Sequence, residues 1–250
     1  MKGRLAQNNR LLISVYDDGK GILPEKVKEL NDNHIHVFDY IEKNGGLYAS
    51  AKSYSVLDYL KGVLENEPYN YTLECGTLNA INFGAPQRRA RFIMVGLKKE
   101  LNIKYAYPEP QFTEGSYRTV RDAIEDIQSI EPEKEVSDRY IELPLHPEAQ
   151  GLEKELRGNF LYNHITTATR ETALSRFKAL KAGENFHDLS PELKTTYSNA
   201  ERTQNTIYMR LKYDEPSGTV VNVRKSMWIH PELDRAISIR EAARLQTFPD

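Results

Sequence analysis

The sequence predicts an α/β fold that contains an antiparallel hairpin, and three observations support this prediction. Apolar and polar residues alternate over 71–77 and an apolar run follows at 92–95, so both segments are expected to be strands, the second one buried. The connection between them contains Gly84 and Pro86, which favour a reversal of the chain. Apolar residues recur at helical spacing over 49–64, which predicts an amphipathic helix packed on a sheet before the hairpin.

The hairpin connection also carries three arginines beside a glutamine. Alternate residues of an extended segment share one face, so Gln87, Arg89 and Arg91 are expected side by side. Guanidinium groups are permanently charged donor forks that suit phosphate oxygens and the edges of bases. The row therefore favours a nucleic acid as ligand. The alternative is a solvated basic strand end paired with surface carboxylates.

Two motifs resemble blocks of the DNA cytosine-5 methyltransferase family. Residues 83–91, FGAPQRRAR, are similar to the family's Gln-x-Arg-x-Arg block. Residues 239–250, IREAARLQTFPD, are similar to its Arg-Glu-Ala-Ala-Arg-Leu-Gln-x-Phe-Pro block. A third passage at 208–221, YMRLKYDEPSGTVV, resembles the end of the family's target-recognition region, and the three passages occur in the family's order.

The resemblance implies a more specific α/β fold. It predicts part of an S-adenosylmethionine-dependent methyltransferase sheet, which is Rossmann-like, ending in the antiparallel hairpin and followed by a small, irregular target-recognition domain. The expected organisation is an N-terminal segment of uncertain role at 1–48, the C-terminal part of the catalytic domain at 49–99, the target-recognition region at 100–235 and a returning, truncated helical segment at 236–250.

The resemblance further implies double-stranded DNA as partner and S-adenosylmethionine as cofactor. Arg89 and Arg91 match the family's two arginines and would support the flipped cytosine. The residues expected to bind the DNA substrate are Gln87, Arg210, Arg224 and Lys225. The implied reaction is methyl transfer to carbon 5 of cytosine in a specific sequence, as in restriction-modification.

The residues that would perform this chemistry are absent from the sequence. The family attacks cytosine with a thiolate from a Pro-Cys dipeptide and receives its cofactor on a Phe-x-Gly-x-Gly turn, and neither motif occurs. Cys75 is followed by glycine in a predicted strand and is expected to be a small buried core residue. We therefore expect a gene fragment or one subunit of a split enzyme, inactive alone, with a second polypeptide that carries the catalytic half and most of the cofactor site.

Two other functions stay open at this stage. Residues 11–22 read as a strand and an Asp-x-Gly-x-Gly turn, before a short helix from Pro24, and resemble the nucleotide-binding turn of histidine-kinase and gyrase-type ATPases. An ATPase remnant is thus one alternative, although a tight strand-to-helix turn explains the same residues. A DNA-binding module without catalysis is the other.

Composition limits the classes of protein further. The 250 residues are 39% hydrophobic and 28% charged, which is ordinary for a globular protein, and no apolar run is long enough to span a bilayer. A single cysteine and the lack of a signal peptide lead us to expect a cytoplasmic protein. The net charge of -2 places any attraction to DNA in local basic patches. The six histidines have no metal-ligand spacing, so no zinc is expected.

Three helices are expected in the second half of the chain. Residues 119–127 read as a short capped helix, and 169–182 as a helix whose charges form a solvated face. The third helix begins after Ser238, with Glu241 in capping-box spacing, and should turn Ala242, Leu245 and Phe248 toward a core.

Overall fold

The fold is described from a computed structural model. It describes the backbone of residues 2–6, 10–15, 35–43, 46–53, 56–136 and 139–250, and the side chains of 56–136, 139–222 and 225–250. The expected turn at 17–22 and the helix from Pro24 lie outside the described residues. Among the helices that are described, none has the length and apolarity that a bilayer crossing requires.

The chain forms two compact units. The first comprises residues 1–75 and 94–106, and the second comprises 76–93 and 107–250. The hairpin strands run through both units. The domain boundaries expected at 48, 99 and 235 remain predictions.

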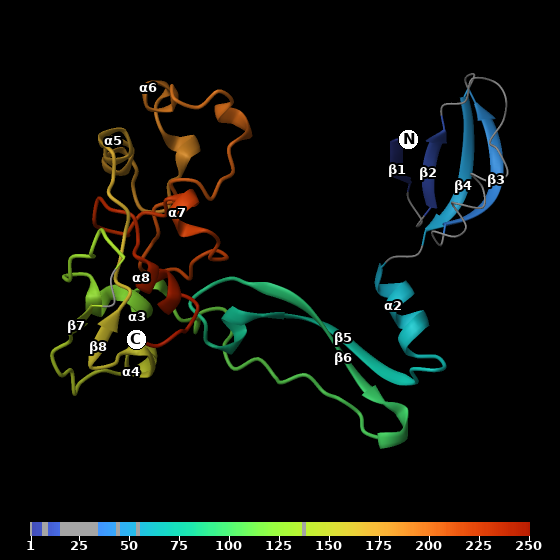
Figure 1. Ribbon diagram of the computed structural model, residues 1–250, viewed down its shortest axis with the longest axis horizontal. Helices are drawn as coiled ribbons and strands as arrows, with labels where there is room; N and C mark the ends of the chain where they lie inside the picture. The colour runs from blue at the N-terminus through green and yellow to red at the C-terminus, as the bar shows by residue number, and fades with distance from the viewer. Residues whose placement is uncertain (1, 7–9, 16–34, 44–45, 54–55, 137–138) are drawn as a thin grey trace. The chain divides into compact units, whose positions relative to one another are not determined.

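The first unit contains a four-stranded antiparallel sheet with the strand order β1-β2-β4-β3 (Figure 1). Its strands are β1 (Lys2–Ala6), β2 (Arg10–Val15), β3 (Ile35–Lys43) and β4 (Gly46–Ser53). The strand predicted near residues 11–16 is confirmed as β2. The helix predicted over 49–64 begins only at Val56, as α2 (Val56–Leu64). Residues 49–52 instead pair with strands on both sides, because tertiary pairing overrides a local helical spacing.

The predicted hairpin is confirmed as β5 (Tyr71–Asn79) and β6 (Ala90–Lys98). Lys99 N donates to the carbonyl of Asn70 and Ala80 N donates to that of Arg89, so the two strands run antiparallel. The expected burial of 92–95 is wrong for its first half, since Phe92 is 53% exposed and Ile93 is 37% exposed. These side chains lie on a two-stranded ribbon rather than inside a layered sheet. Cys75 is likewise only half-buried, so its expected place in a core is also wrong.

The second unit is built from short elements around one larger core. These are α3 (Val120–Ile124), β7 (Tyr140–Glu142), α4 (Gly151–Leu156), β8 (Phe160–Tyr162), α5 (Glu171–Ala179), α6 (Pro191–Lys194), α7 (Val223–Ser226) and α8 (Ile239–Arg244). The core packs α3, α4 and α8 around Trp228, which is 1% exposed. A second cluster packs α5 against Phe186 and Tyr208.

All three predicted helices are present, as α3, α5 and α8. Ser238 caps α8 as predicted: its Oγ accepts from Glu241 N at 3.0 Å and its own N donates to the Glu241 carboxylate at 2.7 Å. Ala242 and Leu245 are buried as expected, but Phe248 is 60% exposed because it follows the end of the helix.

Two further expectations differ from the structure. Arg176 of α5 was expected on a solvated face but is buried. The Rossmann-like sheet is not confirmed, because the strand pairings described within each sheet are antiparallel whereas such a sheet is mainly parallel.

Candidate nucleic-acid interface

The turn of the hairpin is fixed by its own polar groups. The side-chain oxygen of Asn79 accepts hydrogen bonds from Ile81 N and, at 2.8 Å, from Arg89 N. Gly84 ends the 3-10 helix Ala80–Phe83 with a φ of 89°, a conformation that disfavours other residues. A Cβ at this position would also lie 3.0 Å from the ring of Phe112. The base of the arginine row is therefore held in one conformation.

Gln87 joins this turn to two distant segments. It is 2% exposed, its Nε2 donates to the carbonyl of Leu245 at 3.2 Å, and its Oε1 accepts from Val220 N at 3.0 Å. Backbone bonds between Pro86, Arg88 and Ser217 reinforce the junction. The expected role of Gln87 in binding substrate does not fit this placement, since both of its polar atoms are engaged inside the protein.

The three arginines that follow differ in accessibility: Arg89 is half-buried, whereas Arg88 and Arg91 are exposed. Arg89 is half-buried and donates from Nη1 to the carbonyl of Val220 at 3.3 Å. Arg91 is exposed, and its Nη1 donates to the carbonyl of Ala90 at 2.7 Å. Arg88 is exposed as well, with its guanidinium carbon 5.8 Å from the ring centre of Tyr117. Arg89 is thus anchored by one contact, and Arg91 extends from the strand into solvent.

Arg210 is an interior residue, contrary to its expected contact with DNA. It is 4% exposed, and it donates to the carbonyls of Phe177 at 2.6 Å and His230 at 3.0 Å and to the carboxylate of Asp234 at 2.6 Å. A guanidinium with five donors can satisfy several backbone acceptors at once, which explains why it is used here. Lys225 is exposed on α7, whereas the side chain of Arg224 lies outside the described residues.

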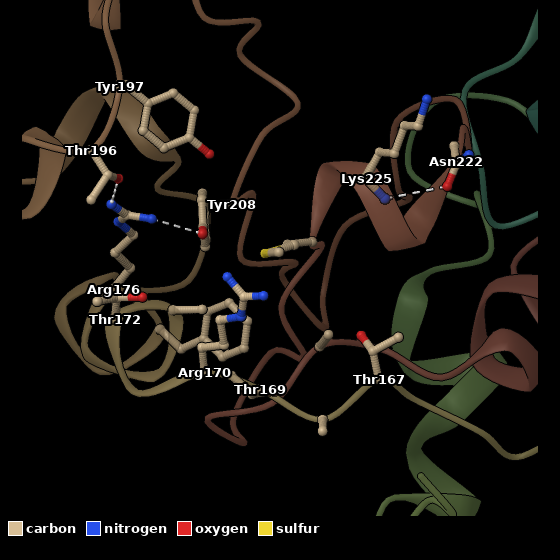
Figure 2. A pocket seen from close by; sticks show the side chains of 15 residues that line it. Thr167, Thr169, Arg170, Thr172, Arg176, Thr196, Tyr197, Tyr208, Asn222 and Lys225 are labelled. Atoms are coloured by element: carbon tan, nitrogen blue, oxygen red, sulfur yellow. Dashed lines mark hydrogen bonds between the residues drawn. The ribbon is translucent and has the colours of Figure 1, made fainter. Parts of the chain in front are cut away.

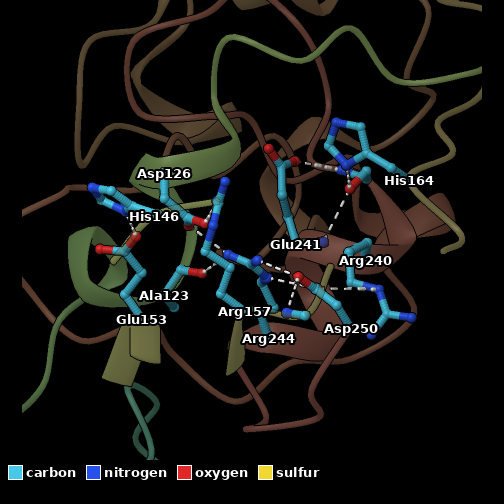
Figure 3. Close-up of polar contacts among 12 residues, drawn as sticks. Ala123, Asp126, His146, Glu153, Arg157, His164, Arg240, Glu241, Arg244 and Asp250 are labelled. Atoms are coloured by element: carbon cyan, nitrogen blue, oxygen red, sulfur yellow. Dashed lines mark hydrogen bonds and ion pairs between the residues drawn. The ribbon is translucent and has the colours of Figure 1, made fainter. Parts of the chain in front are cut away.

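Charged residues of the final motif form a buried network with partners from earlier in the chain (Figure 3). Arg244 is fully buried and bonds the carboxylates of Asp126 and Asp250, each at 2.5 Å. Arg157 meets Asp126 from the other side, also at 2.5 Å. Burial alone would raise the pKa of Glu241, but hydrogen bonds from Arg235 at 2.7 and 2.8 Å leave that pKa below its usual value. Arg244 also donates to the Ala123 carbonyl of α3 at 3.1 Å, and Arg240 donates to the Tyr162 carbonyl of β8 at 2.7 Å, so these contacts fix α8 beside the junction at Gln87.

A buried histidine adjoins this network. Burial lowers the pKa of His230 to about 4, so the ring is neutral at neutral pH. Its Nδ1 accepts from the backbone N–H groups of Glu232 and Leu233. The Tyr213 hydroxyl lies 3.2 Å from its Nε2. His230 therefore organises a turn, and these contacts leave it no free nitrogen for a ligand.

A cleft of about 800 Å³ opens between α5 and α7, and we call it the α5–α7 cleft (Figure 2). Arg170, at the start of α5, and Lys225, on α7, both line it, and Thr167 and Thr172 contribute hydroxyls. Arg176 forms part of one wall, where it donates to the Tyr208 hydroxyl at 2.9 Å. The sequence did not predict this cleft, because its cations are a few among many in the chain. The threonine-rich stretch TTATRET at 166–172 was the one signal that could have indicated it.

Comparison with known families identifies the class of protein. Residues 44–250 match the family described as C-5 cytosine-specific DNA methylase, and the chain belongs to this family. The match agrees with the resemblance of the two sequence motifs. The ATPase-like residues 11–22 lie before the matched region.

Individual relatives are type II DNA methyltransferases. M.DdeI of Desulfomicrobium norvegicum is 31% identical over 206 residues, which are 77% of this chain and 48% of the relative. M.BbvI of Brevibacillus brevis is 30% identical over 228 residues, which are 90% of this chain and 52% of the relative. The chain therefore spans about half the length of these curated relatives.

A solved structure has a similar fold. It is described as a DNA modification methyltransferase encoded within a prophage of E. coli, and it aligns with a TM-score of 0.55 and 23% sequence identity. The alignment covers 72% of this chain and 51% of that one.

Proposed function

We propose that this chain supplies the target-recognition region and part of the active-site wall of a DNA cytosine-5 methyltransferase. The reaction would transfer a methyl group from S-adenosylmethionine to carbon 5 of cytosine in a specific double-stranded sequence, as part of restriction-modification. The observation that carries this proposal is the hairpin end, where Gln87 is clamped inside, Arg89 is anchored to the Val220 carbonyl and Arg91 extends outward from the strand.

Rigid donors at this position suit an extruded base. An enzyme that modifies a base inside a duplex must rotate the nucleotide out of the stack, which costs a few kcal/mol. Fixed donors that meet the cytosine carbonyl and the adjoining phosphate offset this cost. Arg89, anchored to Val220, would face the base, and the more exposed Arg91 would face the phosphate.

The residues described here do not suit the cofactor. S-adenosylmethionine carries a sulfonium cation, which a carboxylate can pair with. It also carries ribose hydroxyls, from which a carboxylate commonly accepts hydrogen bonds. The lining of the α5–α7 cleft instead includes Arg170, Arg176 and Lys225, with no carboxylate among its described lining residues. The cofactor would therefore be bound mainly by segments that this sequence lacks.

The nucleophile would also come from elsewhere. The sequence has no Pro-Cys dipeptide, and Cys75 lies half-buried within β5. We propose that a catalytic half outside these 250 residues supplies the thiolate and the glycine-rich turn.

A labelling experiment tests the proposal. The purified chain is incubated with duplex DNA and labelled S-adenosylmethionine, alone and after co-expression with a polypeptide that carries both missing motifs. We expect DNA binding without label transfer by the chain alone, and sequence-specific transfer by the pair. Transfer by the chain alone would contradict the assignment of the nucleophile, and the absence of any DNA binding would contradict target recognition.

A further inference from the structure

We propose that the α5–α7 cleft holds a backbone phosphate of the bound DNA, with Arg170 and Lys225 as the residues that bind it. This inference rests on the proposed function, because it assumes that DNA is the ligand. It adds a second DNA contact, far along the chain from the hairpin arginines and on elements outside the two family motifs.

The first argument is charge. Arg170 and Lys225 are both exposed and line the cleft, Arg170 at the start of α5 and Lys225 on α7 (Figure 2). Within the described residues neither side-chain cation has a carboxylate partner, and none of the described lining residues is acidic. Cations that line one hollow without a counterion give it a positive potential. An anion bound in the cleft is attracted by both cations.

The second argument is the chemistry of the walls. Thr167, Thr169 and Thr172 line the cleft beside Arg170 and offer hydroxyl donors, which commonly contact phosphate oxygens. The volume of about 800 Å³ is ample for a nucleotide of an intact strand. The cleft is open rather than buried, as a continuous DNA backbone requires.

The third argument is that the wall is preorganised. Arg176 is 6% exposed and donates to the carbonyl of Leu193 at 2.7 Å, to the Thr196 hydroxyl at 2.6 Å and to the Tyr208 hydroxyl. Its guanidinium carbon also lies 5.3 Å from the ring centre of Tyr197. These contacts hold the side chain in place, so its charge adds to the positive potential of the cleft at little entropic cost on binding. We assign Arg176 a positioning role and assign direct phosphate contact to Arg170 and Lys225.

A binding titration at several salt concentrations tests the inference. The affinity of the intact chain for a labelled duplex is measured for the wild type, Arg170→Ala, Lys225→Ala and the double variant. The matched controls are Lys178→Ala and Lys181→Ala, which remove the same charge from exposed sites outside the cleft lining. Circular dichroism and the fluorescence of the single tryptophan, Trp228, verify that each variant is folded.

We expect the double variant, which removes both cations from the one phosphate, to lower the slope of log affinity against log salt by about 1, and each single variant by about half of that, since a lost phosphate contact releases fewer counterions. The controls should leave the slope within about 0.3 of the wild type, because charges outside a contact act weakly through the screened field. The loss should be equal for duplexes of different sequence, since a phosphate carries no base identity.

Two results would overturn the inference while leaving the proposed function intact: cleft variants that behave like the lysine controls, or a loss confined to one DNA sequence, which would assign the cleft to base contact. If the wild type binds no DNA, both the proposed function and this inference fail.

Discussion

Replacement of Glu241 by glutamine tests whether the final motif acts chiefly through its buried ion pair. Glu241 is fully buried and receives two hydrogen bonds from the guanidinium of Arg235, which is itself 12% exposed in its side chain. Glutamine keeps an oxygen for Ser238 N but leaves the Arg235 cation without a counterion. Removal of one partner from a buried pair costs about 3–5 kcal/mol, and the partial exposure of Arg235 places this case near 3 kcal/mol.

The assay is chemical unfolding followed by the fluorescence of Trp228, which is 1% exposed in the core that α8 helps to form. The matched control is Glu155→Gln, which breaks the Arg118–Glu155 pair at the surface, where Glu155 is 57% exposed in its side chain. Exposed pairs contribute about 0–1 kcal/mol. For a chain of this size a loss of about 3 kcal/mol corresponds to a fall in Tm of roughly 6–12 °C. Equal losses in the two variants would refute the reasoning about burial.

Two further predictions concern stability. Gln87→Leu should cost about 2–4 kcal/mol in the same unfolding assay, because Val220 N and the Leu245 carbonyl both lose their partner. Gln246→Leu, which breaks one partly buried bond to the Ala242 carbonyl of α8, should cost below about 1 kcal/mol. Similar costs for the two variants would count against a clamp at Gln87. The wild type should lose stability as pH falls from about 6.5 towards 4, because the unfolded chain protonates His230 at its ordinary pKa while burial keeps the folded pKa near 4. Unfolding midpoints measured across that range, with His187→Gln as control, check the slope; a flat profile in the wild type would contradict the neutral buried ring.

Local patterns predicted the elements whose contacts are close in sequence. The hairpin, the capped α3 and the capping box at Ser238 depend on turn residues and caps a few positions apart, so the sequence contains the needed information. The helix predicted over 49–64 failed at its first part because β4 pairs with β2 and β3, and no local signal reports those partners.

The sequence predicted which residues stand at the hairpin end, but not which of their side chains point into the protein. Alternation placed Gln87, Arg89 and Arg91 on one face, yet only the fold reveals that Leu245 and Val220 enclose Gln87. Arg210 and Arg176 were both predicted to be exposed, because a guanidinium usually is. Both are buried, because they donate hydrogen bonds to carbonyls of segments distant in the chain, which the sequence does not reveal. The roles of Arg89 and Arg91 remain predictions.

The central claim is that the hairpin arginines serve the flipped cytosine rather than general attraction to DNA. The direct measurement is methyl transfer by the chain combined with its catalytic half, beside a salt-dependent binding titration, for Arg91→Ala and for Arg88→Ala, whose side chain lies against Tyr117. We predict that Arg91→Ala lowers turnover far more than affinity, because one phosphate contact among many is a small part of total binding, and that Arg88→Ala leaves turnover nearly unchanged. Equal effects of the two variants, or an Arg91 defect confined to affinity, would contradict the claim and reduce the row to a basic surface strip.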